Sequence, residues 1–132
     1  MAKIAQIATD ATLETAGTWI PYLEDIELLV ARSDNPEFKA WLRTALRPHR
    51  RRLAKIKEKE MRELTLDGWA RYVLKGWKNL QDIDGTEIAY SPEKAAELLR
   101  RSDLKDLYDF VVKNSQDQSN FIQAVLDADL GN

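Results

Sequence analysis

A stripe of apolar residues between positions 66 and 80 is the clearest pattern in the chain. Its members recur at spacings of three and four residues, which places them on one face of a helix. Although Gly76 lies inside the run, the stripe predicts a helix that reaches about residue 80. The apolar residues that define it are Leu66, Trp69, Ala70, Val73, Leu74, Trp77 and Leu80.

Turn and capping residues punctuate the chain after this stripe. Asp84-Gly85 predicts a tight turn, because glycine adopts positive φ without steric cost, and residues 86–90 are short enough for one strand or an extended connection. Ser91-Pro92 predicts a helix start, since the serine hydroxyl can accept a free backbone N–H and proline has none to leave unpaired. Further helices are expected after Ser102 and after Ser115, the last one carrying Phe121, Ile122, Val125 and Leu126.

The N-terminal half predicts a small hairpin followed by a capped helix. Residues 18–23 and 26–32 are rich in aromatic and β-branched side chains and are separated by a short acidic turn. Asn35-Pro36 then favours a helix start. Pro48 is expected to end or kink this helix, because it disfavours helical geometry at the preceding residue. A charged helix resumes over 50–62, and the sequence leaves open whether it breaks near Leu64-Thr65 or runs on into the stripe.

These elements predict a mainly α fold. We expect a compact bundle of about five or six helices, with a small N-terminal β element within Thr18–Arg32. Residues 1–16 show only a thin apolar pattern and are expected to form a weakly ordered N-terminal arm. Residues 17–132 are expected to form a single helical domain, which agrees with the size of an average domain.

Composition excludes several classes of protein. The 132 residues contain no cysteine, which excludes disulfides and thiolate metal sites, and no apolar run approaches the roughly 20 residues that span a bilayer. The net charge of −2 conceals an uneven distribution, since ten of the twenty Lys and Arg residues lie between Lys39 and Arg62. Such unevenness bears on partners rather than on fold.

Catalytic and metal-binding patterns are missing from the sequence. His49 is the only histidine, so triads and two-histidine metal sites are unavailable. Asp82, Asp84 and Gly85 superficially resemble a calcium loop, but aligning the glycine puts Leu80 at the first ligand position. The chain is therefore expected not to be an enzyme and to use neither a cofactor nor a metal.

A cluster of basic residues supplies the candidate binding surface. The cluster is consistent with a solvated helix face, with docking on an acidic protein or, less favourably, with nucleic acid, because the chain is net acidic and no stacking aromatic lies between Trp41 and Trp69. Exposed apolar residues of the N-terminal arm could add to the surface. The candidate protein-binding residues are Arg47, Arg50, Arg51, Arg52, Lys55, Ile4 and Ile7.

Three segments taken together resemble the tail assembly chaperones of tailed bacteriophages. The first is Asn35-Pro36-Glu37-Phe38 with the following LRTALRPHRRR, the second is VLKGWKNLQDIDGTEIAYSPEKAAELL, and the third is the closing Asn120-Phe121. The resemblance extends from about Gly17 to Phe121. Each motif alone consists of hydrophobic patterning and turn chemistry, so the match depends on their order and spacing.

This resemblance implies a non-enzymatic phage or prophage protein. Such chaperones are thought to bind the tape measure protein, keep it soluble and recruit tail tube subunits. They act in the host bacterial cytoplasm and are absent from the mature virion. The resemblance implies no membrane and no cofactor, and it leaves self-association open. The alternative is another small structural protein of the tail or of the head–tail joint, and a nucleic-acid-binding helical module is less favoured.

Overall fold

The computed structural model describes residues 1–122, and in it the predicted stripe is divided between a helix and a strand. Helix α3 spans Glu58–Gly68, a π-helical turn (η3) spans Trp69–Val73, and strand β3 spans Leu74–Lys78. The helix is continuous through residues 64–65, but the prediction that it reaches residue 80 is wrong. Leu74 is extended, at φ −82° and ψ 95°, and glycine at position 76 is a poor helix former.

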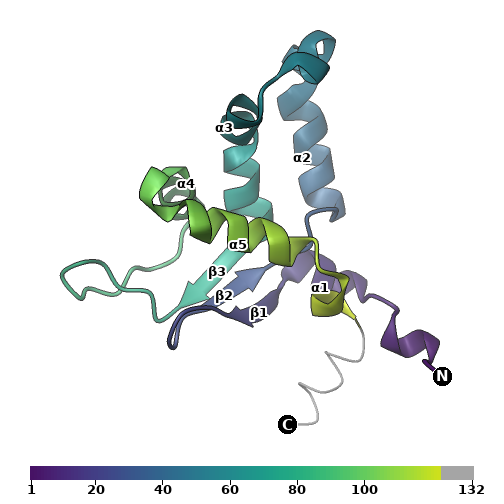
Figure 1. Cartoon of the computed structure of the whole chain (residues 1–132), viewed down its shortest axis with the longest axis vertical. Helices are drawn as coiled ribbons and strands as arrows, with labels where there is room; N and C mark the ends of the chain where they lie inside the picture. The colour runs from purple at the N-terminus through teal and green to yellow at the C-terminus, as the bar shows by residue number, and fades with distance from the viewer. Residues whose placement is uncertain (123–132) are drawn as a thin grey trace.

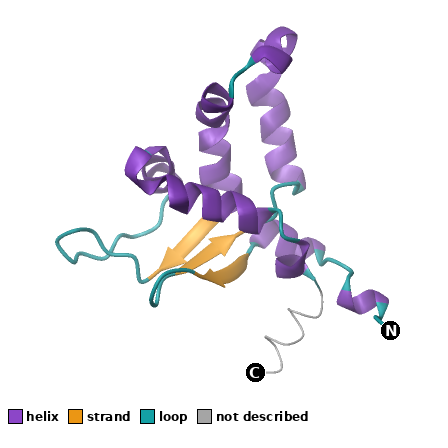
Figure 2. Ribbon diagram, in the orientation of Figure 1, coloured by secondary structure: helices purple, strands orange, loops and turns teal. Residues whose placement is uncertain are grey.

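Strand β3 completes a three-stranded antiparallel sheet in the order β1-β2-β3. Strand β1 spans Thr18–Pro21 and β2 spans Glu27–Val30, so the predicted hairpin is confirmed. In the sheet, Leu28 lies opposite Ile20 on one side and Trp77 on the other. The predicted fold class is wrong, because the third strand makes this a mixed α/β fold rather than a helical bundle with only a small N-terminal β element (Figure 2).

Side-chain caps determine where several helices begin. The remaining helices are α1 (Ala11–Ala16), α2 (Pro36–Leu46), α4 (Pro92–Arg100) and α5 (Lys105–Ser115). The Ser91 hydroxyl accepts a hydrogen bond from the backbone N–H of Lys94 at 3.0 Å, which confirms the predicted start of α4. Short 3-10 helices connect these elements at Ile4–Gln6, Arg47–Lys55, Ser102–Leu104 and Gln118–Phe121.

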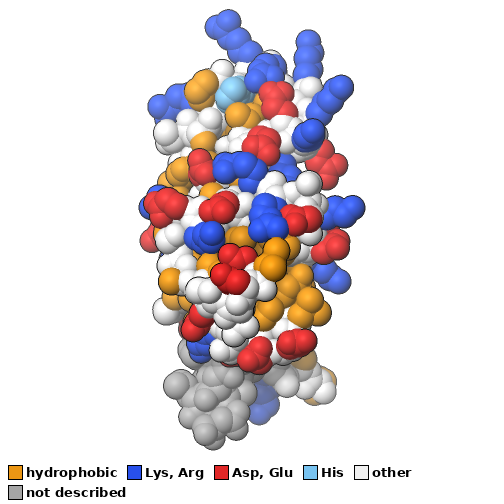
Figure 3. All heavy atoms as spheres, turned by 90° about the vertical axis from the view of Figure 1, so that its left-hand side faces the viewer, with side chains coloured by type: hydrophobic (Ala, Val, Ile, Leu, Met, Phe, Trp, Pro, Cys, Tyr) orange, Lys and Arg blue, Asp and Glu red, His pale blue; other side chains and the backbone are white. Residues whose placement is uncertain are grey.

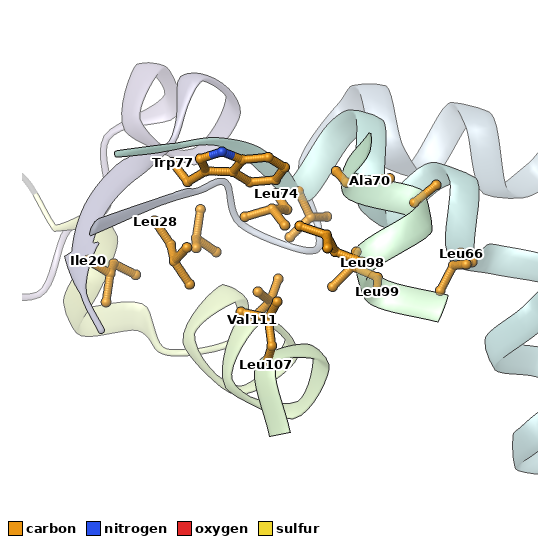
Figure 4. Packing of buried hydrophobic residues seen from close by; sticks show 14 of the residues in the cluster. Ile20, Leu28, Leu66, Ala70, Leu74, Trp77, Leu98, Leu99, Leu107 and Val111 are labelled. Carbon is orange, nitrogen blue, oxygen red and sulfur yellow. The ribbon is translucent and has the colours of Figure 1, made fainter. Parts of the chain in front are cut away.

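The hydrophobic core lies on one face of the sheet. Ile20 and Leu28 point from the strands toward Leu107 and Val111 of α5, which crosses this face (Figure 4). Helix α4 contacts both α5 and α3 and so joins the sheet layer to the helices beyond it (Figure 1). On the opposite face Trp19 is 39% exposed, with the Lys78 ammonium 4.0 Å from its ring centroid.

The segment between β3 and α4 is an ordered turn followed by an extended connection. The Gly85 N–H donates to the Asp82 carbonyl at 2.9 Å, and Gly85 adopts φ +83°, which confirms the predicted turn. The Trp77 indole N–H donates to the Ile88 carbonyl at 2.7 Å. Tyr90 lies against the core, where burial raises its pKa. These contacts hold the connection against the body while its turn extends outward (Figure 1).

Residues 9–16 contact the rest of the chain at two places. The Asp10 N–H donates to the Phe121 carbonyl at 2.8 Å, and Arg32 pairs with Glu14 at 2.7 Å. The division into an N-terminal arm and one domain stays a prediction. Phe121 is buried at the end of the described chain in a short 3-10 turn, whereas Val125 and Leu126 of the predicted last helix lie outside the described residues.

Candidate protein-interaction site

Helices α2 and α3 form a hairpin that projects from the body of the molecule (Figure 1). Helix α2 ends at Leu46, immediately before the Arg47-Pro48 pair, so the predicted end is confirmed. The expected loss of helical geometry at Arg47 is wrong, because Arg47 has φ −54° and ψ −45° and begins a 3-10 helix. The predicted α-helix over 50–62 is partly wrong, because the 3-10 helix Arg47–Lys55 (η2) occupies the tip and the α-helix begins only at Glu58. We call residues 43–59 the tip.

Asn35 anchors the hairpin to the sheet. Its side chain is 2% exposed, and its Oδ1 accepts a hydrogen bond from the backbone N–H of Phe38 at 3.0 Å, which caps α2. Its amide Nδ2 donates to the carbonyls of Arg32 and Tyr72 at 2.7 and 3.1 Å. One buried amide therefore ties the end of β2 and the π-helical turn to the start of α2.

A glycine allows α2 and α3 to approach closely. A Cβ atom placed on Gly68 would lie 2.4 Å from ring atoms of Trp41 and 2.7 Å from a ring carbon of Phe38. Phe38 itself packs edge-on against Trp69, with ring centroids 5.0 Å apart. The direction in which the hairpin projects therefore depends on an aromatic cluster packed over Gly68.

We expect Gly68→Ala to lower the free energy of unfolding by about 1–3 kcal/mol, because the added methyl overpacks buried rings that have little room to move. Chemical denaturation of the full chain measures this change. Gly76→Ala is the matched control, since a Cβ there meets its neighbours at ordinary distances of 3.5 to 3.6 Å. An equal fall in the free energy of unfolding for the two substitutions would contradict the packing described for the hairpin.

Arg62, also part of the basic stretch, belongs to the base of the hairpin. Its guanidinium lies 3.9 Å from the Tyr108 ring centroid and donates to the Leu99 carbonyl at 3.2 Å. Burial raises the pKa of Tyr108, and the charge of Arg62 acts in the opposite direction. Arg62 therefore fastens α3 to α4 and α5.

The five predicted basic residues lie together on η2 at the tip. Arg52 pairs with Glu60 at 2.9 Å and also contacts His49 Nδ1 at 2.9 Å. Arg47, Arg50, Arg51 and Lys55 are exposed and form no ion pair with any described residue. Figure 3 shows Lys and Arg side chains gathered at this end of the molecule. The tip thus presents uncompensated positive charge to solvent.

A groove of about 320 Å³ runs along the tip beside these cations. It combines aliphatic side chains, which can exclude water from a docked apolar group, with arginines that can pair with carboxylates. Its lining residues are Leu42, Leu46, Leu53, Arg43, Arg47 and Arg50. An apolar side chain flanked by carboxylates is the chemistry that fits this groove.

Ile4 and Ile7 lie away from the tip, near the N-terminus of the chain (Figure 1). Both are exposed, at 80% and 58%, and the side-chain amide of Gln118 donates to the Ile7 carbonyl at 2.7 Å. The structure therefore brings the five basic candidates together and separates them from the two isoleucines. A protein-binding role for either group stays a prediction.

Sequence reasoning missed two features of the surface. Arg43 was assigned to no site, although it lies four residues before Arg47, in the last turn of α2, and lines the groove. Ile83 was also missed, and it is 98% exposed in the turn after β3. An isoleucine between two aspartates, just before a turn glycine, is the sequence signal that could have identified it.

The described residues offer no arrangement suited to metal chemistry. Among them, no three His, Asp or Glu side chains gather where they could hold a metal ion. Within residues 1–122, every helix is also too short or too polar to span a membrane.

Comparison with known families places the chain in a class, that of prophage proteins. It belongs to the YdaY prophage protein family, whose model matches residues 33–132. The matched range begins two residues before the Asn35 cap and so includes the whole projecting hairpin. No curated protein and no solved structure matches the chain.

Proposed function

We propose that this prophage protein is a tail assembly chaperone that binds the tape measure protein and recruits tail tube subunits, without catalytic activity. The observation that carries the proposal is the projecting tip, where four exposed cations have no partner among the described residues. Membership in a prophage family and the resemblance of three segments to tail assembly chaperones support the same function.

The chemistry of the tip suits a long, amphipathic client. Uncompensated arginines attract acidic segments over a distance and orient them, while contributing modestly to affinity at the rim. The aliphatic groove then gives apolar side chains of the client a place to dock. A chaperone needs such contacts to be adjustable, because it must hold many different segments of one client and later release them. We further propose that it acts in the host cytoplasm and leaves before the virion matures.

Co-expression with the tape measure protein of the same prophage tests this function. We expect the tape measure protein to remain in the soluble fraction when this chain is present and to aggregate when it is absent. The measurement is the soluble fraction of the tape measure protein at matched expression levels. Equal solubility with and without the chain would contradict the chaperone function.

Two other functions predict different results. A nucleic-acid-binding module predicts that the purified chain is retained on DNA or RNA and that retention weakens steeply as salt rises. A structural protein of the tail or of the head–tail joint predicts that the chain is present in purified virions. Either result, together with no effect on the tape measure protein, would replace the proposed function.

A further inference from the structure

The turn after β3 presents an isoleucine to solvent on an ordered support. Ile83 is 98% exposed, and its backbone N–H donates to Asp82 Oδ1 at 2.8 Å. The Asp82 N–H donates to the Thr86 carbonyl at 2.8 Å, which closes the turn beneath it. The turn therefore holds a large apolar side chain outside the body of the molecule.

Carboxylates flank this isoleucine in the sequence. Asp82 and Asp84 flank it in sequence, and Asp84 Oδ1 accepts a hydrogen bond from the Thr86 N–H at 3.0 Å, which lowers the pKa of Asp84 and keeps it ionised. Acidic side chains of the hairpin turn between β1 and β2 reach the same region. One hollow beside the turn is lined by Glu24, Asp25, Asp82 and Glu87.

The turn and the groove are complementary in both polarity and charge. The turn carries one aliphatic side chain between carboxylates, whereas the groove carries three leucines beside Arg43, Arg47 and Arg50. They belong to different parts of the molecule, because the groove is on the projecting hairpin and the turn extends sideways from the sheet (Figure 1).

We propose that the Ile83 turn of one copy docks into the tip groove of a second copy, with Ile83 against the leucines and Asp82 and Asp84 facing Arg47 and Arg50. Such a contact joins unlike surfaces, so each bound copy still has one free groove or one free turn. Contacts of this kind continue into rings or filaments instead of stopping at a dimer. The assembly needs no client, but it uses the groove that the proposed function gives to the client, so a second copy and the client would compete for it.

Sedimentation velocity of the full chain at increasing concentration measures this assembly. We expect species larger than a dimer that become smaller as salt rises, because the carboxylate–arginine pairs at the rim are screened. Ile83→Ser should raise the dissociation constant about tenfold or more, since it removes the buried aliphatic anchor. Ile4→Ser, at another exposed isoleucine, is the matched control and should leave assembly unchanged.

The opposite surface is tested with Arg47→Glu/Arg50→Glu, which should also abolish assembly. Lys57→Glu/Lys59→Glu carries the same change in net charge on the tip but lies outside the groove, and it should assemble as the wild type does. Circular dichroism confirms that each variant is folded.

Mixing the two defective variants gives the most specific result. The Ile83→Ser chain keeps an intact groove and the Arg47→Glu/Arg50→Glu chain keeps an intact turn, so an equimolar mixture should form one-to-one dimers at concentrations where each variant alone is monomeric. A wild type that stays monomeric at its highest soluble concentration would overturn the proposal. So would variants that assemble like the wild type, or a mixture that forms no dimer. The solubility of the tape measure protein is compared with and without the wild-type chain, so that test can succeed or fail whichever of these assembly results is found.

Discussion

Replacing the buried amide of Asn35 with a carboxylate, in Asn35→Asp, is expected to lower the free energy of unfolding by about 3–5 kcal/mol at neutral pH, the usual cost of an uncompensated buried charge. The cap on α2 survives, because Oδ1 can still accept the Phe38 N–H. The second oxygen, however, would face the carbonyls of Arg32 and Tyr72, to which the amide now donates. The fall in the free energy of unfolding therefore measures the loss of the two hydrogen bonds that the amide donates, and not the loss of the helix cap.

The pH dependence of this variant gives a second test. Burial and the facing carbonyls raise the pKa of the new carboxyl above its unfolded value of about 3.9. The loss of unfolding free energy caused by the ionised carboxyl is thus absent below about pH 4. It appears as pH rises and is complete above the folded-state pKa. Urea denaturation from acid to neutral pH measures it. The matched control is Asp34→Asn at the neighbouring position, whose side chain is 57% exposed, and a cost within about 0.5 kcal/mol is expected there. A small, pH-independent loss in Asn35→Asp would contradict the anchoring role.

The elements that the sequence predicted correctly depend on short-range chemistry. Asn35-Pro36 and Ser91-Pro92 cap helices because the bonding groups lie within three residues of each other. The Asp84-Gly85 turn likewise needs only a residue that tolerates positive φ. Such features can be read from a single stretch of sequence without knowledge of what packs against it.

The third strand could not be predicted in the same way. Leu74 and Trp77 fit a helical stripe as well as they fit a strand, and the choice is made by residues far away in the sequence. Leu74 lies beside Val30, and Trp77 lies beside Leu28 and donates to the Ile88 carbonyl. Pairing with β2 thus overrides the local pattern.

The candidate site also has one part that the sequence predicts and one part that depends on residues brought together by folding. The basic residues were predicted from their spacing in the sequence, and the structure places them on one exposed 3-10 helix. The groove could not be predicted, because it forms only where Leu53 of η2 comes beside Leu42 and Leu46 of α2. A pattern based on charge alone identifies the cations but gives no information about the apolar surface between them.

Reversing the charge of the tip tests whether the tip binds the tape measure protein. In Arg50→Glu/Arg51→Glu/Lys55→Glu, we expect the affinity for the tape measure protein to fall about tenfold to hundredfold, because attraction of acidic client segments becomes repulsion. The matched control is Lys3→Glu/Lys39→Glu/Lys105→Glu, which changes net charge equally at exposed positions outside the tip.

The measurement is the dissociation constant for the purified tape measure protein at low and at high salt, with circular dichroism as the check on folding. We expect strong, salt-sensitive binding by the wild type and the control, together with weak binding by the tip variant. Equal affinity of the tip variant and the control would contradict it, and the basic residues would then be a solvated helical surface.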